Sequence, residues 1–290
     1  MSRAGLIANE KPADSRRFFI FRIMTYCIRL LLLFFFSGCT GKFRLAWEKT
    51  GNTITGSEFY KTAAAYNWKQ RDSLAMHAVF NGNIPPFFKN FKAIEIDITD
   101  SSTGKKITAT YFVSPDYLSV GNAADWARVN ITPMAAQKIA DSMGCFLPTR
   151  KIVNDIYKAA ELKLEPVPMY AFRDSTPTMW HHHLIIEGQR KQRRGLIAGI
   201  KKDVVLSGRI SRDKRPDRMA IYGWHRLSGE PIQPLYTGHI NWWVDYSQGI
   251  RLISRRIRVD GNWMDYLEVL QHPVYRRLIC DEDDCDFYRY

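Results

Sequence analysis

The segment Ala93-Ile94-Glu95-Ile96-Asp97-Ile98 alternates apolar and polar side chains, and Ile107-Thr108-Ala109-Thr110-Tyr111-Phe112-Val113 follows shortly after it. Alternation with a period of two is typical of a strand that buries one face. Between the two runs lies Asp100-Ser101-Ser102-Thr103-Gly104, which consists of residue types that favour turns. The whole stretch therefore predicts a β-hairpin, from which the rest of the fold can be worked out in both directions.

Two helices are expected after the hairpin. Thr132 is suited to cap the first of them, because Pro133 follows at the first helical position and Gly144 stands where a terminating glycine belongs. Thr149 is suited to cap the second, over residues 150–161. The apolar side chains of this second segment recur at helical spacing and predict one buried face, made of Ile152, Val153, Ile156 and Tyr157.

The chain beyond residue 203 is rich in short apolar runs typical of strands. The expected strands comprise residues 204–206, 219–225, 231–234, 240–246 and 250–259. The aromatic segment 170–183 lacks a clear period and is expected to be a surface loop. A hairpin, a helical pair and a mostly antiparallel β region predict an α+β fold. We expect one domain over 59–290, preceded by a tether at 39–58; two small domains divided near residues 166–168 are the alternative.

The N-terminus has the parts of a secretory signal. Basic residues precede the apolar run 30–36, which ends in Ser37-Gly38-Cys39. This run is well short of the ~20 residues that span a bilayer. The small residues before Cys39 resemble the lipobox of bacterial lipoproteins, and that resemblance implies cleavage of a signal peptide at 1–38 and lipid attachment to Cys39. A plain signal peptide or anchor with an incidental cysteine is the alternative, and Met24 is a second candidate start.

Composition and charge narrow the class of partner. The 290 residues are 46% hydrophobic and 24% charged, which excludes a disordered chain, and the net charge is +13. Residues 1–38 contain six basic and two acidic residues, so they contribute +4 to the net charge of +13. Residues 39–290 then carry a net charge of +9. For an exported protein this charge favours an anionic envelope or extracellular polymer as partner and argues against nucleic acid. The lipid anchor adds the membrane, and the expected location is the cell envelope, periplasmic or surface-facing.

The remaining cysteines have separate expected roles. Cys280 and Cys285 are close in sequence, and in an oxidising compartment they are expected to form a small disulfide loop. Cys145 is then the odd thiol. It is either a nucleophile activated by a histidine or a buried, inert side chain.

Residues 219–251 are dense in side chains that perform chemistry. On a strand, His239 and Asp245 would share one face, which is the minimum for a histidine base oriented by a carboxylate. His225 is a second candidate acid or base. The alternative is that both histidines only satisfy hydrogen bonds within the fold.

The order of Cys145, a helix and histidine-bearing strands resembles the papain-like amidases of the NlpC/P60 cell-wall peptidase family. This resemblance implies Cys145 as nucleophile, with His225 or His239 in place of the family's histidine. In that family the cysteine begins its helix directly, whereas Phe146, Leu147 and Pro148 intervene here.

Two functions follow as expectations. The first is a lipid-anchored hydrolase of a peptide or glycan polymer, with His239, His225, Asp245 and Cys145 as catalytic candidates. The second is a non-catalytic lipoprotein that binds polysaccharide on an aromatic platform, because aromatic rings stack on the apolar faces of sugars. The expected substrate-binding residues are Arg251, Trp224, Trp242, Trp243 and Tyr236. We expect no cofactor, and we expect the run His181-His182-His183 to be exposed rather than to hold a metal.

Overall fold

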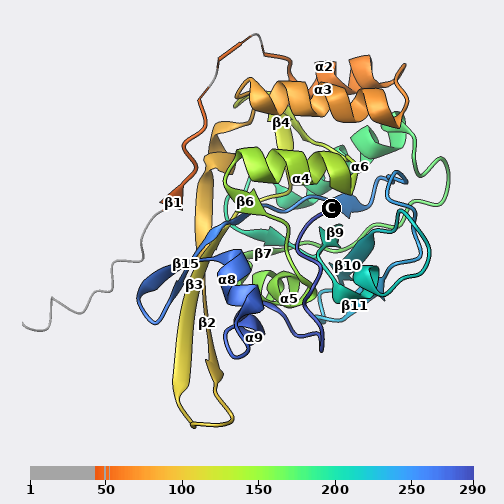
Figure 1. Cartoon of the computed structure of the whole chain (residues 1–290). Coiled ribbons are helices and arrows are strands. Elements are labelled where there is room, and N and C mark those ends of the chain that lie inside the picture. The colour runs from red at the N-terminus through yellow and green to blue at the C-terminus, as the bar shows by residue number, and fades with distance from the viewer. Residues whose placement is uncertain (1–42, 49, 52) are drawn as a thin grey trace, which may run out of the picture. The chain divides into compact units, whose positions relative to one another are not determined.

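The predicted hairpin is confirmed in the computed structural model, which describes residues 43–48, 50–51 and 53–290. Strands β2 (Asn90–Thr99) and β3 (Lys106–Val113) pair antiparallel, from Lys92 opposite Val113 to Thr99 opposite Lys106. Asp100 closes the turn, since its carboxylate accepts hydrogen bonds from Ser102 and Thr103. The far end of the hairpin projects from the body of the molecule (Figure 1).

The hairpin belongs to a seven-stranded sheet. Its strand order is β1-β2-β3-β13-β6, with β14 pairing both β3 and β15. The additional strands are β1 (Phe43–Arg44), β6 (Cys145–Phe146), β13 (Ile253–Ser254), β14 (Arg256–Val259) and β15 (Asn262–Asp265). The predicted strand 250–259 is thus two short strands separated at Arg255, whose backbone N–H bonds to the carbonyl of Gly144.

A second sheet of four strands has the order β11-β10-β9-β12. Its members are β9 (Lys202–Val205), β10 (Ala220–His225), β11 (Pro231–Tyr236) and β12 (Gln248–Gly249). Strand β12 lies parallel to β9, while the other pairs are antiparallel. Two further two-stranded sheets pair β4 (Ser119–Gly121) with β5 (Trp126–Arg128) and β7 (Leu162–Lys163) with β8 (Ile197–Ala198).

Helices cover these sheets, with α2 and α3 at one end of the molecule and α8 and α9 beside the hairpin (Figure 1). Those described are α2 (Gly56–Ala63), α3 (Trp68–Phe80), α4 (Pro133–Ser142), α5 (Arg150–Ala159), α6 (Thr176–Arg190), α7 (Gly208–Ser211), α8 (Tyr266–Gln271) and α9 (Arg276–Ile279), with a 3-10 turn η2 (Pro86–Lys89). The expected helical pair is α4 and α5. Thr132 and Thr149 cap these helices as predicted, each accepting a backbone N–H three residues ahead.

The expectation of a loop over 170–183 was wrong from residue 176 onward, because α6 occupies this part of the chain. Ser175 caps the helix, and its buried side includes Met179, His182, Ile186 and Arg190 at helical spacing. Two of these four side chains are polar. An apolar period could not reveal a helix whose buried face is partly made of histidine and arginine.

Two other expectations need correction. Residues 240–246 do not form a strand: Ile240 makes a single bridge to Arg218, and the chain then turns. The side chain of Asp245 bonds to the backbone and hydroxyl of Ser247, which competes with strand pairing. The predicted tether is also too long, because Phe43 and Arg44 join the main sheet and Leu45 is buried.

The α+β class is confirmed by these helices and mostly antiparallel sheets. The described residues belong to one compact unit, and most buried apolar side chains form one continuous core. Within the described part of the chain, no helix combines the length and apolarity needed to cross a bilayer. The predicted signal peptide and Cys39 lie outside the described residues.

Candidate functional site

Cys145, the predicted nucleophile, lies in the core. Cys145 lies in β6 opposite Ser254 and is 2% exposed. Its thiol contacts the carbonyl of Met143 at 3.5 Å. Burial raises the pKa of the thiol well above its ordinary value, so the nucleophilic thiolate is not formed near neutral pH. Among the described residues no histidine hydrogen-bonds to it. The thiol therefore has the character of the inert alternative, and the papain-like arrangement is not assembled.

His225 is also built into the fold. Its ring stacks on Tyr157 with centroids 4.5 Å apart, and its Nε2 lies 3.1 Å from the side-chain oxygen of Asn154. Burial lowers the pKa of His225 to about 4. The ring is thus neutral at pH 7. It packs against α5, and it forms no hydrogen bond or ring contact with Cys145 or Asp245 in the described structure.

Asp245 is the centre of a charged group that we call the Asp245 cluster, made of Arg173, Lys202, His239 and Asp245. One carboxylate oxygen accepts from Arg173 at 2.8 Å and faces Lys202 at 3.8 Å. The other accepts from the backbone and hydroxyl of Ser247 at 2.9 and 2.6 Å. Burial raises the pKa of Asp245, but Lys202, Ser247 and Arg173 together outweigh burial and lower it.

His239 is half-buried, and Asp245 is among the charged groups that act on its pKa. Its ring meets Tyr236 edge-on with centroids 5.3 Å apart. Burial lowers the pKa of His239 against the opposing effect of Asp245, so the ring is neutral at pH 7. In the described structure no hydrogen bond joins His239 to Asp245, and both oxygens of Asp245 have other partners.

The five predicted substrate-binding residues divide into two groups. Arg251 and Trp224 are buried: Arg251 donates to the carbonyls of Ser114 and Ile197, and the indole N–H of Trp224 donates to that of Ile200. As sequence features they looked like contact residues, but they support the fold from inside. Exposed aromatic rings belong to the other three, Trp242 (39% exposed), Trp243 (37%) and Tyr236 (46%).

The three histidines of the run 181–183 lie in two different environments. His181 is exposed as expected, but His182 and His183 are buried on the inner side of α6. No group of three or more His, Cys, Asp or Glu side chains that could hold a metal ion is present in the described part of the chain. The predicted disulfide between Cys280 and Cys285 is confirmed.

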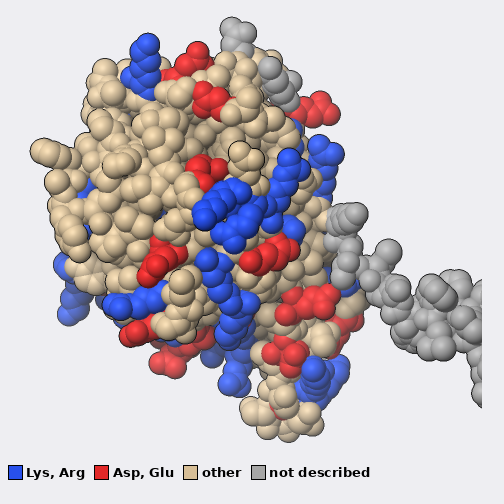
Figure 2. Space-filling model, turned by 180° about the vertical axis from the view of Figure 1, so that it is seen from behind, with Lys and Arg blue, Asp and Glu red and all other residues tan. Residues whose placement is uncertain are grey.

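A cleft of about 730 Å³ lies elsewhere in the molecule, and no residue of the Asp245 cluster lines it. We call it the basic cleft. It is formed where β1, η2 and β2 meet the chain at 115–126 and the end of α6 with its following loop. Its lining comprises Arg44, Pro86, Phe87, Asn90, Lys92, Pro115, Asp116, Ala123, Ala124, Trp126, Glu187, Arg190, Gln192, Arg194, Gly195 and Ile197. Figure 2 shows Lys and Arg side chains gathered with a few acidic ones on the rear face.

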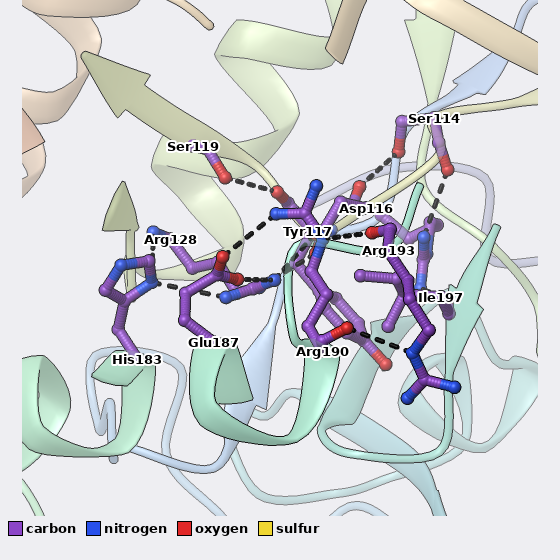
Figure 3. A network of polar contacts seen from close by, with 11 residues as sticks. Ser114, Asp116, Tyr117, Ser119, Arg128, His183, Glu187, Arg190, Arg193 and Ile197 are labelled. Carbon is purple, nitrogen blue, oxygen red and sulfur yellow. Dashed lines mark hydrogen bonds and ion pairs between the residues drawn. The ribbon is translucent and has the colours of Figure 1, made fainter. Parts of the chain in front are cut away.

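An ion-pair network supports the floor of the basic cleft. The Arg128 side chain is fully buried and donates to both oxygens of Asp116 at 2.8 and 2.7 Å, and to Glu187 at 2.9 Å. The ring Nδ1 of His183 lies 3.2 Å from the same guanidinium. Figure 3 shows these side chains converging from β5, α6 and the segment before β4. Both oxygens of Asp116 bond to Arg128, so the negative charge of this buried carboxylate is balanced by a cation inside the protein.

Arg190 is held in the cleft by two aromatic rings, an ion pair and a hydrogen bond. Its guanidinium lies over Phe87 and Trp126, 5.3 and 5.2 Å from the ring centroids. It also donates to Glu187 at 3.0 Å and to the carbonyl of Arg193 at 2.8 Å. A guanidinium fixed in this way loses little side-chain freedom when an anion binds.

The rim carries less constrained cations. Arg44 and Arg194 are exposed, and neither forms an ion pair with a residue that the structure describes. Lys92 pairs with Glu161 at 3.3 Å on the surface. The sequence offered one signal for this site, the basic run 190–194, but only its first and last arginines line the cleft. Lys201 and Lys202, which follow this run in the sequence, are buried and do not line the cleft.

The cleft thus presents guanidinium groups beside two aromatic rings. This arrangement suits a phosphate or carboxylate attached to a flat or apolar body. Comparison of the chain with known protein families, with curated proteins and with solved structures finds no match, so the assignment of the site rests on its geometry.

Proposed function

We propose that this protein is an exported, lipid-anchored binding protein whose basic cleft takes phosphate or carboxylate groups of the cell envelope. The observation that carries the proposal is the cleft itself: about 730 Å³, with Arg190 fixed over Phe87 and Trp126 and two exposed arginines on its rim. The lipid anchor rests on the lipobox-like sequence before Cys39.

The charge of the cleft supports an anionic ligand. Its lining contains four cations against two carboxylates, those of Asp116 and Glu187. Both carboxylates already accept hydrogen bonds from arginines, so neither is available to attract a cation. Arginine presents paired N–H groups that match the two oxygens of a carboxylate or phosphate.

Binding to polymers of defined chemistry tests this function. The mature chain, residues 39–290 with Cys39→Ser, is titrated with polyphosphate, polygalacturonate and neutral dextran. We expect binding to one or both polyanions, and no binding to dextran. The double variant Arg44→Gln/Arg194→Gln should weaken binding about tenfold or more, which corresponds to about 1.4 kcal/mol.

The matched control is Arg256→Gln/Arg258→Gln, which removes two basic side chains from β14 with the same change in net charge. Equal weakening by the control would mean that binding follows total charge, and the cleft would lose its assigned role. Equal affinity for dextran would also refute the proposal.

Hydrolysis at the Asp245 cluster is the second candidate. The observation that favours it is a half-buried, neutral His239 near enough for the ionised Asp245 to oppose the lowering of its pKa, with Arg173 and Lys202 paired to that carboxylate. A neutral imidazole can accept a proton from water or a hydroxyl group. Incubation with peptidoglycan and a polysaccharide panel should then release products that His239→Gln abolishes, and no product from any substrate would eliminate this candidate.

A further inference from the structure

The position of Arg44 relates the basic cleft to the predicted lipid anchor. Residues 40–42 separate Cys39 from Phe43, and a chain of that length reaches at most about 14 Å. Arg44 follows at once in β1 and lines the cleft. If Cys39 carries lipid, the chain length alone keeps this end of the cleft close to the membrane surface.

The chemistry of the cleft matches that surface. Arginine and lysine near an anionic leaflet are attracted to its phosphates, and this attraction falls off within about a Debye length, near 8 Å at physiological salt. Aromatic rings are favoured at the level of the lipid headgroups. The cleft combines both kinds of group, with Arg44, Arg190 and Arg194 beside Phe87 and Trp126.

Binding of a headgroup needs no rearrangement of the buried network. The buried Arg128 already forms an ion pair with Asp116, and Arg190 forms one with Glu187. The exposed arginines Arg44 and Arg194 are available at the rim without breaking an ion pair to any described residue. A ligand phosphate would therefore meet cations whose positions the fold has already set.

We infer that the basic cleft is a second membrane contact, which binds the phosphate of anionic phospholipid headgroups in the bilayer that holds the anchor. This inference rests on the proposed function and names the source of the anionic group. The cleft would thereby fix which face of the domain rests on the bilayer.

Vesicle co-sedimentation of the protein without its covalent lipid anchor tests the inference. The unlipidated mature chain with Cys39→Ser is mixed with vesicles of phosphatidylcholine, or of equal parts phosphatidylcholine and phosphatidylglycerol, at low and high salt. We expect salt-sensitive binding to the anionic vesicles only. The variant Arg44→Glu/Arg194→Glu should bind about thirtyfold more weakly, while Arg256→Glu/Arg258→Glu should stay within about threefold of the unsubstituted chain. Matching thermal unfolding curves establish that both variants are folded.

The outcomes separate the inference from the function it rests on. Anionic vesicle binding that is lost in the cleft variant and kept in the control supports the inference. Equal loss in both variants overturns it, because attraction would then depend on net charge. Binding to polyphosphate or polygalacturonate without binding to anionic vesicles also overturns it, while the proposed function stands. Failure to bind either vesicles or polyanions refutes both.

Discussion

The Asp245 cluster and the basic cleft both bring charged and aromatic side chains together, but they leave different groups facing solvent. In the Asp245 cluster the carboxylate is buried and fully engaged by Arg173, Ser247 and Lys202. In the cleft the carboxylates of Asp116 and Glu187 form ion pairs with the buried Arg128, and other cations remain exposed at the surface. A high density of charged and aromatic residues is therefore a weak sign of a binding surface. Cations that stay exposed and form no ion pair within the protein are a stronger sign.

The largest expected effect comes from removing the cation under the cleft. Arg128→Met leaves Asp116 buried without its counter-charge, so the free energy of unfolding should fall by about 3–5 kcal/mol. Urea denaturation measures this change. The control Lys106→Met removes an exposed ion pair with Asp97 and should cost less than about 1 kcal/mol. If Arg128→Met cost no more than its control, the cleft would not depend on the buried network.

Removing the charge of the Asp245 cluster should cost less. Asp245→Asn leaves Lys202 buried without a counter-charge, but Arg173 is 44% exposed and can be hydrated, so we expect a loss of about 2–3 kcal/mol. Urea denaturation at pH 7 measures it.

The pH dependence of this loss has a defined sign. The pKa of Asp245 is lower in the folded protein, so its contribution is complete above the ordinary value near 4 and disappears as the pH falls through the lower, folded-state pKa. The difference between the original chain and Asp245→Asn should therefore shrink only below about pH 4. A difference that shrank between pH 6 and pH 5 instead would contradict an ionised, paired carboxylate.

His182 is buried on the inner side of α6 and should set a smaller, pH-dependent effect. Its ring meets Tyr246 edge-on at 4.9 Å, and burial lowers its pKa to about 2. Below the ordinary value near 6.5 the unfolded chain binds a proton that folded His182 does not, so stability falls with falling pH. His182→Phe should remove about 1.4 kcal/mol per pH unit from that dependence between pH 6 and pH 5.

Exposed His77 provides the matched control. His77→Phe should leave the pH dependence of the unfolding free energy unchanged over the same interval. An unchanged slope in His182→Phe would show that His182 already takes up its proton in the folded state.

How much of the molecule the sequence could predict depends on what generates each feature. The hairpin, the caps at Thr132 and Thr149 and the disulfide follow from local patterns, and all are confirmed. Helix α6 escaped prediction because His182 and Arg190 occupy positions of its buried face. The cleft escaped because it joins segments far apart in the chain, from Arg44 to Arg194, that no local period relates.

The predicted site residues show the same limit. His239 and Asp245 are joined by a turn instead of the strand that the alternation indicated, and no hydrogen bond joins them in the described part of the chain. Cys145 and Arg251 have the chemistry of site residues, and only tertiary packing reveals that they are buried. Residue type indicates what a side chain can do, whereas its exposure follows from long-range contacts.

On the proposed function, anion binding belongs to the basic cleft and not to the Asp245 cluster. The most direct test is the dissociation constant for polyphosphate of two folded double variants of the unlipidated mature chain. Each variant replaces two basic or imidazole side chains by glutamine. We expect about tenfold or greater weakening in Arg44→Gln/Arg194→Gln and less than about twofold in Arg173→Gln/His239→Gln. The reverse order, or equal weakening in both, would contradict the proposed function.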